Sequence, residues 1–211
     1  EPVAYILGRR GFRHLELRCD SRALIPRPET ELLVEIALEE RPASVLDVGT
    51  GSGAIALAIA DELPNAEVFA VDTSPPALEL ARENAAALGL ANRVSFGLGA
   101  LLPPRRFDLI VANLPYVREA DWSGLALEIT RFEPPGALLG GADGLDPIRN
   151  LASALLPGST PALAGFGCEV VALEIGEGQA DEVSSILTAA GLREISVRRD
   201  VAGIDRVVVG R

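Results

Sequence analysis

The sequence contains no lysine and no methionine, one histidine and only two cysteines among its 211 residues. Without lysine, a Schiff-base nucleophile is excluded, and so is a phosphate-binding P-loop, whose motif requires that residue. The single His and the distant Cys19 and Cys168 leave no room for a Cys/His zinc site or a disulfide framework, so no metal is expected. Free cysteines are typical of a reducing compartment, so we expect the protein in the cytoplasm.

Basic charge is also scarce, because 19 arginines face 30 acidic residues and the net charge is −11. A broad nucleic-acid-binding surface is rich in Lys and Arg, so direct nucleic-acid binding is not expected. No apolar run reaches the ~18 residues of a membrane span, so no membrane association is expected either. With 48% hydrophobic and 23% charged residues, the composition instead suits one folded domain.

From residue 44 onward, apolar runs that predict strands alternate with segments that predict helices. The strands are expected at 45–48, 68–72, 94–96, 107–112 and 169–175, and the helices at 54–60, 75–88, 145–156 and 180–190. This alternation is typical of βαβ units and a mostly parallel sheet. Two last strands, at 194–198 and 206–209, are joined too closely for a parallel crossover, so we expect them to pair antiparallel.

Before residue 44 the pattern is less regular. Apolar stretches at 3–7 and 15–17 surround a Gly- and Arg-rich centre, which predicts a β-hairpin or two short strands. Pro26 and Pro28 end this region, and acidic residues then precede the apolar run at 32–38. Acids are favoured at the start of a helix, so this run is predicted to be helical.

A glycine-rich turn follows the first strand of the alternating region and reads Asp-Val-Gly-Thr-Gly-Ser-Gly-Ala over residues 47–54. Glycines at alternate positions let a ligand approach the backbone closely, and the helix that follows favours an anionic group at its N-terminus. Asp72 ends the next strand, where it can accept hydrogen bonds from ribose hydroxyls. The pattern fits a loose dinucleotide fingerprint and, equally, the glycine motif of S-adenosylmethionine-dependent methyltransferases.

The tetrapeptide Asn113-Leu114-Pro115-Tyr116 directly follows the strand expected at 107–112, at the same edge of the sheet as the glycine turn. The Asn113 side-chain carbonyl and the backbone carbonyls after it can accept hydrogen bonds from an NH₂ group. Pro115 stiffens the backbone, and Tyr116 offers a flat face to a planar amide or base. This set favours a methyltransferase that acts on a planar NH₂ group over a hydride-transfer enzyme.

The tetrapeptide resembles the [Asn/Asp]-Pro-Pro-Tyr motif of amino-methyltransferases, with Leu114 in place of the first proline. Segments along nearly the whole chain are similar to the HemK (PrmC) family, at 4–8, 24–34, 131–134, 140–145 and 200–210. The most specific is Ile-Pro-Arg-Pro-Glu-Thr-Glu at 25–31. The resemblance implies an α/β, Rossmann-like class I methyltransferase fold: a mostly parallel seven-stranded sheet with an antiparallel C-terminal strand, preceded by a β-hairpin.

The resemblance also implies an activity and an organisation of the chain. The methyl group of S-adenosylmethionine would pass to the side-chain amide nitrogen (N5) of the glutamine in the Gly-Gly-Gln motif of class I peptide-chain release factors, leaving S-adenosylhomocysteine. Residues 1–28 would be a hairpin linker and 29–211 the catalytic domain, while the helical substrate-binding domain that precedes the hairpin in this family is expected to be absent here.

Site roles follow from the resemblance position by position. The cofactor would be bound by Gly49, Thr50, Gly51, Ser52, Gly53, Asp72, Leu101 and Asn113, and the substrate glutamine by Asn113, Leu114, Pro115 and Tyr116. The methyl group would pass directly, in line, from sulfur to nitrogen. The Asn113 oxygen and the Leu114 carbonyl would orient the amide NH₂ and stabilise the positive charge that develops on its nitrogen. His14 is expected to be structural or exposed to solvent.

Three alternatives stay open at the level of sequence. An amino-methyltransferase acting on adenine or guanine of RNA or DNA is compatible with Leu114, which adenine-dimethylating ribosomal RNA enzymes tolerate, although the acidic charge and segment 25–31 count against it. An NAD-dependent oxidoreductase fits the glycine turn. A non-catalytic binding module fits Leu114 together with Ala100, which stands near the position where the family commonly has an acidic residue.

Overall fold

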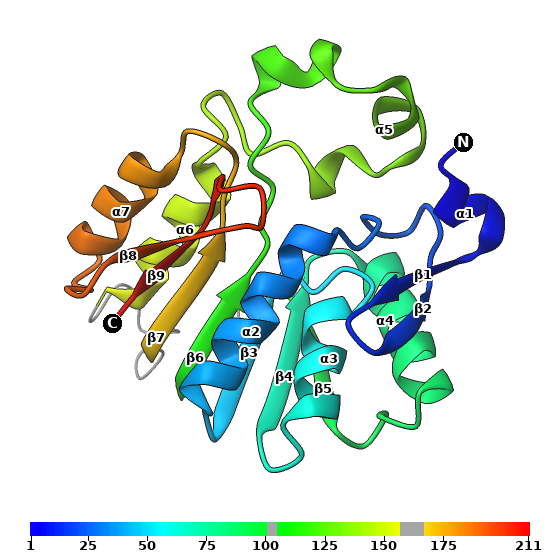
Figure 1. Ribbon diagram of the computed structural model, residues 1–211, viewed down its shortest axis with the longest axis horizontal. Helices are drawn as coiled ribbons and strands as arrows, with labels where there is room; N and C mark the ends of the chain where they lie inside the picture. The colour runs from blue at the N-terminus through cyan, green and yellow to red at the C-terminus, as the bar shows by residue number, and fades with distance from the viewer. Residues whose placement is uncertain (101–104, 157–166) are drawn as a thin grey trace.

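The computed structural model describes residues 1–100, 105–156 and 167–211, and its centre is a seven-stranded sheet (Figure 1). The strand order is β5-β4-β3-β6-β7-β9-β8. The strands are β3 (Ser44–Val48), β4 (Glu67–Asp72), β5 (Val94–Leu98), β6 (Arg106–Ala112), β7 (Gly167–Glu174), β8 (Ser196–Arg199) and β9 (Asp205–Gly210). Each lies where the sequence predicts a strand, to within a few residues.

Strand directions also agree with the prediction. The β5, β4, β3, β6 and β7 strands pair in parallel, whereas β9 runs antiparallel to both β7 and β8. The β3 strand lies between β4 and β6, so the chain order reverses there. In an open α/β sheet this reversal opens a crevice at the carboxyl ends of the strands, where ligands bind.

Helices cover both faces of the sheet, as the nearly continuous apolar strands predict. One face carries α2 (Glu31–Glu40), α3 (Ala54–Glu62) and α4 (Pro75–Ala87), and the other carries α6 (Asp146–Leu155) and α7 (Ala180–Ala189). All five residues of β3 are buried. At the start of α4, the Ser74 hydroxyl accepts a hydrogen bond from the Ala77 N–H at 3.3 Å, and Pro75 occupies the first turn.

The N-terminal region contains the predicted hairpin, formed by β1 (Arg9–Phe12) and β2 (Leu15–Arg18) in antiparallel register. The expectation of a strand at 3–7 is wrong, because α1 (Val3–Leu7) is a short helix. Gly8 ends it in the left-handed conformation (φ 67°), where its N–H reaches the Ala4 and Tyr5 carbonyls. No described strand lies beside this segment to satisfy its backbone as a sheet would. The hairpin itself packs on the main core through the buried Phe12 and Leu17.

Between β6 and α6 the chain crosses above the carboxyl ends of the strands (Figure 1). This crossing contains the 3₁₀ turns η2 (Glu119–Gly124) and η3 (Pro135–Ala137) and the short helix α5 (Leu127–Phe132); a further 3₁₀ turn, η1 (Pro28–Thr30), leads into α2. No pattern in the sequence predicts the structure of this crossing. Among the described residues, no helix is both long and apolar enough to cross a membrane.

Candidate active site

A cavity of about 940 Å³ lies at the carboxyl ends of β3, β4 and β6. The residues that line it lie in the segments 22–30, 48–55, 72–77, 99–100, 113–115 and 134–141 and along α6 at 146–154. The glycine turn and the Asn-Leu-Pro part of the tetrapeptide therefore face one common space, as their positions in the sequence predict.

The glycine turn follows β3 and needs its glycines for their backbone conformation. Gly49, Gly51 and Gly53 have φ of 75°, 57° and 86°, a region that other residues rarely adopt. The N–H groups of Gly49 and Thr50 donate to the Val71 carbonyl at 2.9 and 3.0 Å, which ties the turn to β4. The turn thus presents backbone rather than side chains to the cavity.

Asp47 holds the glycine turn from inside the protein. Its Oδ2 accepts hydrogen bonds from the Thr50 hydroxyl at 2.6 Å and from the Ala56 N–H at 3.2 Å. The side chain is completely buried, and its Oδ1 has no hydrogen-bond partner within the described residues. Burial raises the pKa of this carboxyl to about 7, against the lowering effect of the Thr50 and Ala56 hydrogen bonds.

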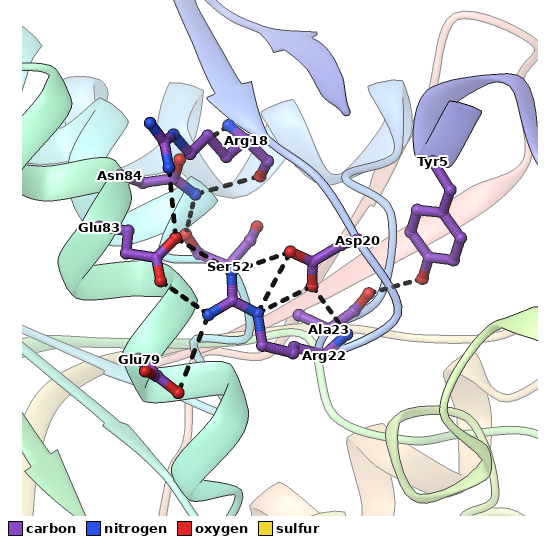
Figure 2. A network of polar contacts seen from close by, with 9 residues as sticks. All are labelled: Tyr5, Arg18, Asp20, Arg22, Ala23, Ser52, Glu79, Glu83 and Asn84. Carbon is purple, nitrogen blue, oxygen red and sulfur yellow. Dashed lines mark hydrogen bonds and ion pairs between the residues drawn. The ribbon is translucent and has the colours of Figure 1, made fainter. Parts of the chain in front are cut away.

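A second anchor of the turn comes from the hairpin, through the buried Asn84 of α4 (Figure 2). The Asn84 Nδ2 donates to the carbonyls of Ser52 at 2.9 Å and Arg18 at 3.2 Å, while its Oδ1 accepts from the Arg18 N–H at 2.7 Å. Beside it, Arg22 forms hydrogen-bonded ion pairs with Asp20 and Glu83. Asn84 lies 32 positions from Ser52 and 66 positions from Arg18, so no local sequence motif predicts this link between hairpin, helix and turn.

Asp72 lies at the end of β4 and lines the cavity. Its Oδ2 accepts from the Gly51 N–H at 2.9 Å and its Oδ1 from the Ser74 N–H at 2.8 Å. Each carboxylate oxygen has two acceptor sites, so both keep capacity for a hydroxyl group in the cavity. Asp72 is therefore held in place at the cavity, where its role in ribose binding stays a prediction.

Asn113 takes its orientation from Thr30, which lies at the end of η1. The Asn113 Nδ2 donates to the Thr30 Oγ1 at 3.0 Å, so its Oδ1 remains an acceptor at the cavity. Next to it, the Leu114 side chain packs over the glycine turn: a Cβ built on Gly49 would lie 3.2 Å from the Leu114 Cδ2. The two turns thus touch each other where cofactor and substrate would meet.

A second glycine-rich segment, at 140–144, packs closely against the backbone carbonyls of the tetrapeptide. A Cβ on Gly140 would lie 2.5 Å from the Pro115 carbonyl oxygen, and one on Gly144 would overlap the Tyr116 carbonyl oxygen. The Gln179 Nε2 donates to that same Tyr116 oxygen at 3.1 Å. Only glycine permits this close approach, which explains the glycines in a segment that carries part of the family resemblance.

The Tyr116 side chain turns away from the substrate position expected for it. It is not among the residues that line the cavity, and its hydroxyl donates to the Glu174 Oε1 at 3.4 Å. Burial raises the pKa of Tyr116 to about 12, with a further contribution from the Glu174 charge. The expected stacking of Tyr116 on the substrate stays a prediction.

Glu133 precedes Pro134, which lines the cavity, and the sequence does not mark it as a site residue. Its side chain is 1% exposed and pairs with Arg27 at 2.5 Å, while its Oε2 accepts from the Ile25 N–H at 3.1 Å. Both partners belong to the segment 25–31, which the resemblance marks as specific. This pair fastens that segment to the crossing that contains α5.

Two other sequence expectations concern residues outside this network. Leu101 lies outside the described residues. The His14 side chain is 74% exposed, 3.9 Å from Glu62, in agreement with the expectation that it is structural or faces solvent.

Comparison with known proteins shows the family. A family described as a methyltransferase domain matches residues 45–136. A release factor glutamine methyltransferase of Xylella fastidiosa is 48% identical over 218 residues, covering all of this chain and 76% of that protein. The chain belongs to the release factor glutamine methyltransferase family. A relative of the same description from Rhodospirillum rubrum is 43% identical over 216 residues, and this chain spans 65% of its length.

A solved structure gives the same fold from outside the family. The ribosomal protein L11 methylase of Lactobacillus delbrueckii superposes with a TM-score of 0.58 at 22% identity, covering 88% of this chain and 80% of that one. The predicted class I methyltransferase fold is therefore confirmed. Family and fold both favour the methyltransferase over the NAD-dependent alternative.

S-adenosylmethionine is the methyl donor in this family, and the residues of the cavity fit it. The backbone turn at 49–53 leaves space that a side chain would fill, Asp72 keeps acceptor capacity for ribose hydroxyls, and the cavity has the size typical of cofactor sites. The turn at 49–53 would hold the methionine part of the cofactor, and Asp72 would hold the ribose. Asn113 lines the same cavity beside this turn.

Proposed function

We propose that this chain transfers the methyl group of S-adenosylmethionine to the side-chain amide nitrogen of the glutamine in the Gly-Gly-Gln motif of class I peptide-chain release factors. The observation that carries the proposal is the acceptor set at the cavity, in which Thr30 fixes the Asn113 amide with its oxygen free. Relatives described as release factor glutamine methyltransferases, 42–48% identical along the whole chain, support the choice of substrate.

An amide nitrogen is a poor nucleophile because its lone pair is delocalised into the carbonyl group. The bound cofactor supplies a methyl group made electrophilic by the sulfonium to which it is attached. The Asn113 Oδ1 and the Leu114 carbonyl oxygen accept hydrogen bonds from the two N–H groups of the glutamine amide. These hydrogen bonds turn the nitrogen lone pair toward the cofactor side of the cavity. The same two oxygens stabilise the positive charge that develops on nitrogen as its bond to the methyl carbon forms and the bond from that carbon to sulfur breaks. The nitrogen then loses one N–H proton to water, which leaves the neutral N-methyl amide.

The rest of the molecule suits a protein substrate. The net charge of −11 disfavours a polyanion such as RNA, and both cysteines are free, as expected for a reaction in the cytoplasm. The close packing of residues 140–144 against the tetrapeptide carbonyls supplies preorganisation for orienting the substrate amide. The division into a hairpin linker at 1–28 and a catalytic domain at 29–211 remains part of this proposal.

The test is methyl transfer from radiolabelled S-adenosylmethionine to purified class I release factor. We expect label in the wild-type factor and none in a factor whose Gly-Gly-Gln glutamine is replaced by glutamate, a matched control of the same size. Ribosomal RNA serves as a competing acceptor in parallel. Label in RNA and none in the release factor would overturn the proposal in favour of a nucleic-acid methyltransferase.

A further inference from the structure

Arg27 is a partly buried cation in the wall of the cavity, separate from the acceptor set formed by Asn113 and Leu114. Its side chain is 32% exposed, and its Nη2 donates to the Glu133 Oε1 at 2.5 Å. Glu133 is buried and accepts the Ile25 N–H at its other oxygen, at 3.1 Å. The Glu133 carboxylate is thus held at both oxygens, and it fixes the Arg27 guanidinium at the cavity.

Most donors of the Arg27 guanidinium have no partner inside the protein. A guanidinium carries five N–H groups, and within the described residues no hydrogen bond is recorded from the Arg27 Nε or Nη1. Arg22 also lines the cavity, but its Nε, Nη1 and Nη2 all donate to Asp20 or Glu83 (Figure 2). Among the described residues that line the cavity, Arg27 is therefore the cation with donors left for a ligand.

The glycine turn has little capacity left to bind an anion. The N–H groups of Gly49 and Thr50 donate to one carbonyl of β4, and that of Gly51 donates to the Asp72 carboxylate. The Gly53 N–H donates to the Thr50 carbonyl at 2.9 Å. Four of the five N–H groups of the turn are thus committed within the protein, and Asp72 adds negative charge to the cavity. A carboxylate bound beside this turn therefore needs donors from elsewhere.

The cofactor of this family brings such a carboxylate. In S-adenosylmethionine the α-carboxylate of the methionine part is the one anionic group, beside a cationic ammonium and a cationic sulfonium. The turn that would hold the methionine part lies against the segment that contains Arg27, since a Cβ built on Gly51 would lie 3.9 Å from the Ala23 Cβ. Further along the same segment, Thr30 accepts a hydrogen bond from Asn113. Arg27 thus stands between two points at which its segment meets the turns of the site.

We propose that Arg27 binds the α-carboxylate of the cofactor through the N–H groups that Glu133 leaves free, and that Glu133 is the positioning residue that holds Arg27 there. Charge-assisted hydrogen bonds from a guanidinium to a carboxylate are among the strongest that side chains form. The pair therefore makes the site selective for ligands that carry the carboxylate. This inference concerns the cofactor side of the cavity and does not depend on which molecule accepts the methyl group.

The experiment compares two ligands by calorimetry: S-adenosylhomocysteine and its decarboxylated analogue, in which hydrogen replaces the α-carboxylate. We expect the wild type to bind S-adenosylhomocysteine about 10- to 100-fold more tightly than the analogue, as for hydrogen bonds to a charged group. In Arg27→Gln we expect the affinity for S-adenosylhomocysteine to fall by about the same factor. The affinity of Arg27→Gln for the analogue is expected to stay within about threefold of wild type, so the preference for the carboxylate disappears.

Two further proteins separate ligand binding from folding. Arg27→Gln leaves the buried Glu133 charge without its partner, so the double variant Arg27→Gln/Glu133→Gln removes both charges and keeps side chains of similar size. We expect the double variant to lose the preference for the carboxylate as well. Arg22→Gln is the matched control, because the donors of Arg22 are already bound to Asp20 and Glu83, and we expect it to keep the wild-type preference. Thermal melting checks that each protein is folded.

The ratio of the two affinities decides the inference. If Arg27→Gln and the double variant lose affinity equally for both ligands, Arg27 only supports the shape of the cavity and the inference is overturned. A wild type without the preference, or an Arg27→Gln protein that keeps it, overturns the inference too. Unchanged binding of S-adenosylhomocysteine with a raised KM for the release factor would instead assign Arg27 to the protein substrate. Because calorimetry needs no methyl acceptor, failure to methylate release factor would refute the proposed function and leave this result standing.

Discussion

The two turns at the carboxyl edge of the sheet are held by different means. The glycine turn at 49–53 is held mainly by its own strand and the neighbouring β4, through Asp47, the Val71 carbonyl and Asp72. The tetrapeptide at 113–116 is instead held by groups far away in the sequence, at positions 30, 140–144 and 174–179. The cofactor side is thus fixed mostly by β3 and the neighbouring β4, with Asn84 as a more distant anchor, whereas the substrate side depends on assembly of the whole domain.

Both turns nevertheless have a buried carboxyl behind them, Asp47 for the glycine turn and Glu174 for the tetrapeptide. Each has one oxygen that lacks a hydrogen-bond partner among the described residues. Asp47 accepts hydrogen bonds from a backbone N–H and, at 2.6 Å, from the Thr50 hydroxyl within the same turn, so it acts as a clamp on that turn. Glu174 accepts a longer hydrogen bond from the Tyr116 hydroxyl at 3.4 Å, so the carboxyl behind the tetrapeptide is held less tightly.

The largest difference between the two sides is expected from Asn113→Ala. The change removes the oxygen that orients the substrate amide but leaves the glycine turn and Asp72 intact. We expect kcat to fall by about 10²–10³-fold, as when one preorganised group of an oxyanion hole is lost, with unchanged affinity for S-adenosylhomocysteine. Single-turnover kinetics and calorimetry measure the two quantities separately. Unchanged methyl transfer would show that the tetrapeptide does not orient the substrate.

The next effect concerns stability and the two buried carboxyls. Their pKa is raised from 3.8 for Asp47 and 4.5 for Glu174 to about 7. Below about pH 4 the two carboxyls are protonated in both the folded and the unfolded protein. Between about pH 4 and pH 7 they stay protonated in the folded protein but not in the unfolded one. The free energy of unfolding therefore falls as the pH rises through this window. The loss is on the order of 3 kcal/mol for each group.

Asp47→Asn and Glu174→Gln are therefore each expected to remove about half of the decline in unfolding free energy between pH 5 and pH 8. Denaturant unfolding at several pH values measures the decline. A wild-type stability that is flat between pH 5 and pH 8 would contradict the raised pKa values.

On the cofactor side, Asp72→Ala is expected to weaken S-adenosylhomocysteine binding by about 30-fold, close to 2 kcal/mol, because hydrogen bonds to a charged acceptor are lost. In contrast to Asn113→Ala, kcat at saturating cofactor is expected to stay within a fewfold of wild type. Glu79→Ala, which removes a 70% exposed carboxylate near Arg22, is the matched control and is expected to bind normally. Equal affinity in both variants would remove Asp72 from the cofactor site.

The same contrast explains how far the sequence alone predicts the molecule. Strand positions, the antiparallel β9 and the meeting of the two turns follow from periodicity and from residues next to each other in the chain. Asn84, Glu133 and Glu174 do not, because their partners lie 32 to 108 positions away and single buried polar residues carry no pattern. The expected strand at 3–7 is wrong because five apolar residues show no decisive period, and a Gly at the next position ends a helix as readily as a strand.

The smallest expected effect probes the contact between the two turns, at Leu114. Proline at this position, as in the motif that the tetrapeptide resembles, fixes φ and loses the Leu114 packing over Gly49. Within the described residues no hydrogen bond is recorded from the Leu114 N–H, so proline removes none. Because the stiffening and the lost packing oppose each other, we expect Leu114→Pro to change stability by less than about 1 kcal/mol and to raise kcat less than about fivefold.

Leu114→Ala separates the two contributions, since it loses the packing without gaining stiffness. We expect kcat of the alanine variant to fall below wild type and that of the proline variant to exceed it, with melting temperatures that differ by a few degrees. The two variants share the lost leucine side chain, so their ratio reports backbone rigidity at the substrate turn. A proline variant slower than the alanine variant would mean that contact with the glycine turn, and not rigidity, positions the substrate amide.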